Sequence, residues 1–140
     1  MAKTFEELRA FQRAMDLTVA VYRATDRFPQ AELYGITSQL RRAARSVASH
    51  IAEGQGRLTL GEWRQMLSQA RGSLFEVEAD LIAANRLGFL TDDAAAELRR
   101  QLEQAAKPLA GLIAYVVKRE RQLPTGNRQR RVAINTPSAK

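Results

Sequence analysis

Apolar residues recur every three or four positions through most of the chain, which is the period of an α-helix with one buried face. The pattern predicts four helices, at about residues 5–28, 36–53, 60–86 and 92–121. In the first helix the predicted buried stripe consists of Leu8, Phe11, Met15, Val19, Tyr22 and Thr25. No strand pattern competes with the helical one, so we predict an all-α protein.

Residues at the helix boundaries support this division of the chain. Thr59 and Thr91 precede the third and fourth helices, where a hydroxyl group can cap the first turn. Gly54 and Gly56 are expected to end the second helix, and Gly88 the third. Pro108 lies inside the fourth helix, and we expect it to kink or interrupt that helix because proline lacks an amide hydrogen.

Four amphipathic helices with short connections pack as antiparallel neighbours, so the predicted fold is an up-down-up-down four-helix bundle. We assign residues 1–122 to this domain. Residues 123–140 have no apolar period, and we predict a disordered basic tail.

The composition excludes several kinds of site. The chain has no cysteine and one histidine, which excludes disulfides and thiol nucleophiles and argues against a metal site. No arrangement of serine, histidine and acids suggests catalysis, so we expect no enzymatic activity and no cofactor. The longest apolar run, residues 109–117, is too short to span a membrane, and no signal peptide is evident. We therefore expect a cytoplasmic protein.

The charge favours a polyanionic partner. The net charge is +7, and residues 123–140 contribute four bases and no acid. Nucleic acid is the usual partner of such a basic tail.

The third helix carries a second apolar strip at Phe75, Ala79 and Ile82. A helix in a monomeric bundle needs only one buried stripe, so this strip predicts a subunit interface.

The tight connection between the second and third helices sets their register, with facing positions whose numbers sum to about 118. The register predicts an ion pair between Arg42 and Glu76, and small residues that let the backbones approach closely. The resulting contact, which we call the seam, comprises Arg42, Ser46, Glu53, Gly72, Ser73 and Glu76. With Arg42 engaged there, Arg41 and Arg45 are expected to be the more available pair.

The runs FPQAELYGITSQLRRAARSVASHIAEGQGR, ARGSLFEVEADL and NRLGFL resemble the four-helix bundle proteins encoded within intervening sequences of bacterial 23S ribosomal RNA genes. The resemblance covers about residues 5–117, and it extends more distantly to the accessory variability determinant of diversity-generating retroelements. It implies a homopentamer with a basic surface that binds nucleic acid, RNA or DNA, and a possible reverse transcriptase partner. His50 and Pro108 depart from the family pattern.

Two interpretations of the basic residues are open. Either they form a solvated surface, or they contact phosphates without reading sequence. The candidate contacts are Arg41, Arg45, Arg57, Arg64, Arg71, Arg128, Arg130 and Arg131. On the second interpretation the protein is an accessory module for nucleic acid, structured RNA in particular. The alternative function is a scaffold that recruits a protein such as a reverse transcriptase or another RNA-processing enzyme. A helix-turn-helix centred on Gly72 is disfavoured, because the apolar spacing continues unbroken through it.

Overall fold

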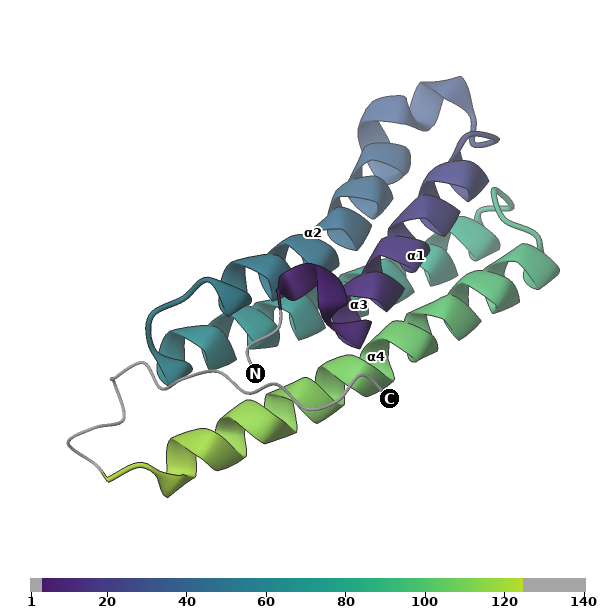
Figure 1. Ribbon diagram of the computed structural model, residues 1–140. Coiled ribbons are helices and arrows are strands. Elements are labelled where there is room, and N and C mark those ends of the chain that lie inside the picture. The colour runs from purple at the N-terminus through teal and green to yellow at the C-terminus, as the bar shows by residue number, and fades with distance from the viewer. Residues whose placement is uncertain (1–3, 125–140) are drawn as a thin grey trace.

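The computed structural model describes residues 4–124 and contains four long helices in the predicted order (Figure 1). Their bounds are Arg9–Thr25 for α1, Ser38–Gln55 for α2, Leu60–Arg86 for α3 and Asp92–Gln122 for α4. A short 3-10 turn, Phe5–Glu7, precedes α1. Another, Gln30–Glu32, leads through the π-helical turn Leu33–Thr37 into α2. The predicted tail from residue 125 onward lies outside the described residues.

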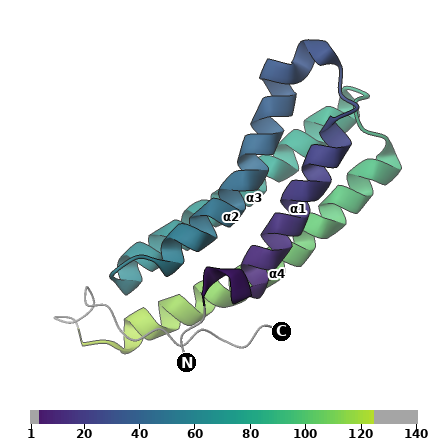
Figure 2. The same cartoon turned by 45° about the horizontal axis from the view of Figure 1, so that its top comes forward.

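Each helix packs beside its neighbours in sequence, and α1 also packs beside α4, so α1 and α3 lie on a diagonal of the bundle. Figure 2 shows the same arrangement from a second direction, with α2 beside α3 and α1 beside α4. The predicted all-α, up-down-up-down four-helix bundle is confirmed. With 17 residues against 27 and 31, α1 is much shorter than α3 and α4 and covers only part of their length.

The core forms where the stripes of the four helices meet. Trp63 of α3 is fully buried and makes an edge-to-face contact with Tyr115 of α4, with ring centroids 6.4 Å apart. The apolar period predicts buried stripes on the third and fourth helices, and only Met66 and Ile113 of these stripes remain partly exposed. The stripe residues are Trp63, Met66, Leu67, Ala70, Leu74, Val77, Leu81 and Ala84 on α3, and Ala95, Leu98, Leu102, Ala105, Leu109, Leu112, Ile113 and Val116 on α4. The α3 stripe is much longer than the second strip on that helix, which makes its buried face predictable.

The helix boundaries agree with the predicted signals in most places. The hydroxyl oxygens of Thr59 and Thr91 accept hydrogen bonds from the amides of Glu62 and Ala94, each at 3.1 Å. Gly88 follows the end of α3 with a φ of 82°, a conformation that favours glycine over other residues. At the end of α2 the helix continues through Gly54 to Gln55, and Gly56 is the cap. In contrast, α4 continues through Pro108, so the expected interruption does not occur. The carbonyl of Gln104 loses its helical partner there, but Gln104 is exposed and solvent can hydrate it.

The predicted buried stripe of the first helix is wrong at two positions. Met15 and Val19 are about 40% and 41% exposed, and Ala14 and Leu17 occupy the core instead. Small residues let α1 approach α2 closely, and the Thr18 hydroxyl donates to the Ala44 carbonyl oxygen at 3.2 Å. Met15 and Val19 therefore face outward on α1.

Candidate nucleic-acid interface

The outward face of α2 is basic. Three arginines and a single acid, Glu53 in the last turn, occur in this helix. Arg42 and Arg45 are both exposed, and within residues 4–124 neither has a carboxylate partner. Their positions, three residues apart, place the two guanidinium groups on one side of the helix. This pair is the most available positive charge on α2.

Arg41 has a different role from the one expected. Its Nε donates to the Thr25 hydroxyl at 2.8 Å and its Nη2 to a carboxylate oxygen of Asp26 at 3.1 Å. The guanidinium also lies over the Tyr22 ring, 4.8 Å from the centroid. The prediction that Arg41 is an available partner of Arg45 is therefore wrong, because α1 and the turn after it occupy its donors.

The predicted ion pair between Arg42 and Glu76 is also wrong as a direct contact. Both side chains are exposed, and no ion pair joins α2 to α3 in the part of the chain that the structure describes. Arg42, and not Arg41, is therefore the available basic residue beside Arg45.

The helices α2 and α3 approach each other most closely at a different residue from the ones predicted for the seam. Ser73 is buried and Ser46 half-buried, whereas Glu53 is exposed and pairs with Arg57 at 3.4 Å. Gly72 is exposed, and a Cβ atom there would meet nothing within 4 Å. The close approach lies at Gly54, where a Cβ atom would stand 2.8 Å from Cδ1 of Trp63.

The remaining predicted contacts differ in availability. Besides Glu53, Arg57 contacts the Met66 sulfur at 3.7 Å, and Arg64 Nε donates to Glu120 at 2.8 Å. Arg71 is exposed and lies over the Phe75 ring at 5.6 Å, without a carboxylate partner among the described residues. Arg128, Arg130 and Arg131 lie outside the described residues.

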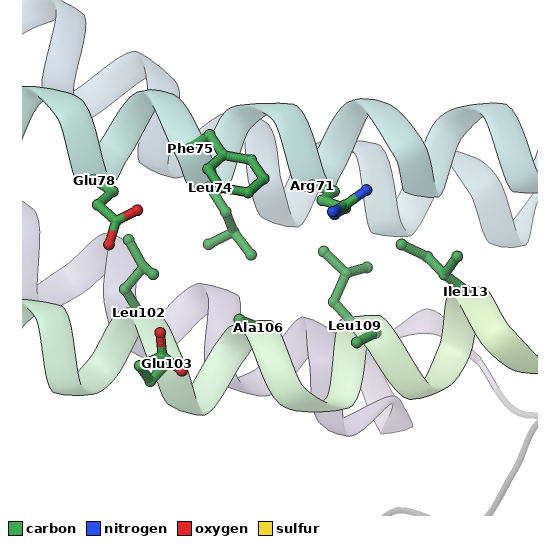
Figure 3. Close-up of a pocket in the computed structure, with 10 residues that line it drawn as sticks. Arg71, Leu74, Phe75, Glu78, Leu102, Glu103, Ala106, Leu109 and Ile113 are labelled. Atoms are coloured by element: carbon green, nitrogen blue, oxygen red, sulfur yellow. The ribbon is translucent and has the colours of Figure 1, made fainter.

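The second apolar strip of α3 is exposed, as a subunit interface requires. The exposed fractions of Phe75 and Ile82 are 59% and 37%, and Ala79 is also exposed. Phe75 stands at the edge of a groove between α3 and α4, which encloses about 190 Å³ (Figure 3). Its lining residues are Arg71, Leu74, Phe75, Glu78, Leu102, Glu103, Ala106, Leu109, Ala110 and Ile113.

Sequence reasoning missed a further exposed surface on α1. Met15 and Val19 stand four residues apart and project from the face that was predicted to be buried. The available signal was that α1 is apolar on two faces, since Ala10, Ala14, Leu17 and Val21 form an equally regular series.

Acidic groups offer no clear chemistry. Burial raises the pKa of Asp80, and the nearby negative charge of Glu76 raises it further. Over residues 4–124, no three histidine or acidic side chains gather as a metal ion would require. The Nδ1 atom of His50 is buried without a hydrogen-bond partner in the same range.

None of the helices in that range combines the length and hydrophobicity needed to cross a bilayer.

Comparisons with known proteins agree with the resemblance in the sequence. No curated protein matches the chain. The family model of the 23S rRNA-intervening sequence proteins matches residues 6–111, which is most of the chain and includes all of α1, α2 and α3. The protein therefore belongs to the 23S rRNA-intervening sequence protein family.

Proposed function

We propose that the protein is a non-enzymatic, oligomeric accessory protein that binds nucleic acid, structured RNA in particular, through phosphate contacts. The observation that carries this proposal is the exposed pair Arg42 and Arg45 on a helix whose only acid lies in its last turn. Guanidinium groups without carboxylate partners remain free to bind phosphate oxygens.

Oligomerisation would make a small basic surface effective. Two arginines on one subunit bind phosphate weakly, but the same pair repeated around a homo-oligomer binds one long polyanion at several points. The exposed Phe75 and Ile82 support self-association. A pentamer is the assembly that the family resemblance implies. The tail arginines, Arg128, Arg130 and Arg131, would add phosphate contacts.

Binding measured against salt concentration tests the proposal. We expect the affinity for an RNA hairpin to fall steeply with salt, and Arg42→Gln with Arg45→Gln to reduce the logarithmic salt slope by about two per contacting protomer. The matched control is Arg86→Gln with Lys107→Gln, which removes the same charge from exposed positions elsewhere. Equal loss in both variants, or no binding at low salt, would contradict the proposal.

A second candidate function is a scaffold for a protein partner such as a reverse transcriptase. It is favoured by the apolar side chains of Met15, Val19 and Phe75, which are exposed and have no affinity for phosphate. Capture from a nuclease-treated lysate separates the two functions, because a protein partner is retained after the nucleic acid has been digested.

A further inference from the structure

The outward face of α1 carries an apolar ridge, formed by Phe11, Met15 and Val19. These residues are spaced by four, so their side chains lie in one row along the helix. Phe5 extends the row, since its ring meets the Phe11 ring edge-to-face at 5.0 Å. The ridge exposes two large apolar side chains, Met15 and Val19, and Val19 also borders a polar hollow between α1 and α4. An exposed apolar row of this kind is typical of a protein contact surface.

The groove between α3 and α4 is the opposite kind of surface. Its floor is apolar, with Leu74, Leu102 and Leu109 pointing into the space between the helices (Figure 3). At about 190 Å³ it is smaller than the roughly 300–1,000 Å³ of typical small-molecule pockets. It suits protruding side chains better than a separate ligand.

Two ion pairs join the helices on either side of this floor. Arg99 contacts Glu78 at 3.0 Å near the start of α4, and Arg64 contacts Glu120 at 2.8 Å near its end. Glu78 also lines the groove, so one pair lies at its edge and the other lies beyond its opposite end.

Both surfaces carry charged side chains without ion-pair partners among the described residues, and on the groove these are the base Arg71 and the acid Glu103. Arg23, one turn beyond Val19, is exposed and has no carboxylate partner in residues 4–124. Glu103, on the groove, is exposed and equally lacks a basic partner in that range. Arg71 and Glu103 lie toward opposite ends of the groove (Figure 3). A ridge that docks with Arg23 toward Glu103 keeps Arg23 away from Arg71.

We propose that the α1 ridge of one copy docks into the α3–α4 groove of the next copy. This inference rests on the proposed oligomer and specifies its contact. From Phe11 to Val19 the ridge is about 12 Å long, and the groove from Leu102 to Ile113 is about 16 Å long, so the lengths match. Because ridge and groove are different surfaces, the contact is head-to-tail.

The positions of the ridge and the groove on the bundle determine the geometry of the oligomer that the contact forms. The ridge and the groove lie on different sides of one bundle, with α1 diagonal to α3. Each added copy is therefore rotated relative to the last, and a head-to-tail contact with rotation closes into a ring when the rotation allows it.

Cysteine cross-linking tests the contact cleanly, because the natural chain has no cysteine. Met15→Cys and Ala110→Cys change exposed positions, one on the ridge and one in the groove. We expect a short bis-maleimide to link the two variants only when they are mixed. The full-length chain with both substitutions should give a covalent ladder that stops at the ring size. Ser49→Cys, on the outer face of α2, is the control position.

Three other results of these measurements would each reject a specific part of the proposal. Cross-linking of Met15→Cys or Ala110→Cys with itself would retain the oligomer and reject the head-to-tail contact. A wild-type protein that is monomeric by light scattering would reject the oligomer in the proposed function as well. Assembly that is lost when residues 125–140 are removed would identify the tail as the occupant of the groove and reject the ridge.

Charge exchange supplies an independent readout. Arg23→Glu and Glu103→Arg should each weaken assembly about tenfold, and the double exchange should restore it. A merely structural role of either residue predicts additive loss, which would overturn the proposed pairing.

Discussion

Helix α3 packs against α2 on one flank and against α4 on the other, and the two contacts differ in kind. On the α2 flank, Gly54 lacks a side chain and the fully buried Trp63 fills the space beside it. On the α4 flank, ion pairs lie toward both ends and an apolar groove lies between them. The first contact is closed within one chain, and the second leaves apolar surface uncovered.

The difference shows which side of α3 is fully packed within a single chain. Close backbone approach requires a residue without a Cβ atom, and Gly54 supplies it on the α2 flank only. On the α4 flank Phe75 turns outward and remains 59% exposed. Stability of the single chain therefore depends on the closed flank, and association is expected at the open one.

The largest expected effect comes from Gly54→Ala on the closed flank. The new Cβ atom would stand 2.8 Å from Trp63 Cδ1 and 3.2 Å from Met66 Cβ. Because such overpacking forces side chains or backbone to shift, we expect a loss of about 1–3 kcal/mol in the free energy of unfolding. Denaturant unfolding followed by tryptophan fluorescence measures it, since Trp63 is the only tryptophan.

Gly72→Ala is the matched control, because it makes the same chemical change in open space. Alanine favours a helix over glycine by about 0.8–1.0 kcal/mol, so this variant should be more stable than the natural protein. Two variants that shift stability in the same direction would contradict the assignment of the close approach to Gly54.

The number and order of the helices, and the buried faces of α3 and α4, could be predicted because each of these helices has a single dominant apolar stripe. The buried face of α1 could not, since Met15 and Val19 form as regular a series as Ala14, Leu17 and Val21. Helix periodicity shows which residues share a face but does not decide which of two apolar faces turns inward. On α1 the face in contact with α2 is the buried one, and there the Thr18 hydroxyl donates to the Ala44 carbonyl oxygen.

The candidate site was less predictable than the fold for a related reason. Three residues of α1 and the turn after it hold Arg41, namely Thr25, Asp26 and Tyr22, and none is adjacent to it in sequence. Small residues on the facing helices suggested a seam, but the choice between Gly54 and Gly72 depends on how each glycine is rotated toward the neighbouring helix. An approximate register does not fix that rotation.

A smaller effect is expected from the ion pair between Arg64 and Glu120 on the open flank. Its N–O distance is 2.8 Å, and the Glu120 side chain is only 19% exposed. A double-mutant cycle with Arg64→Met and Glu120→Gln should give a coupling of about 0.5 kcal/mol that falls at high salt. A coupling indistinguishable from zero at low salt would show that the pair between Arg64 and Glu120 does not stabilise the α4 flank.

The smallest effect concerns Asp80, a partly buried acid of α3. Burial and the nearby Glu76 raise the pKa of Asp80, so the folded protein holds a proton more tightly than the unfolded chain. Stability from this group is present below the ordinary pKa of an aspartate and is lost as the pH rises through the raised value. Asp80→Asn should therefore unfold at a higher denaturant concentration than the natural protein at pH 7, with a difference that shrinks toward about pH 3. Asp16→Asn is the control, because Asp16 is exposed and pairs with Arg13 at 3.6 Å. If Asp80→Asn lowered stability at pH 7, a basic group must compensate the Asp80 carboxylate in solution.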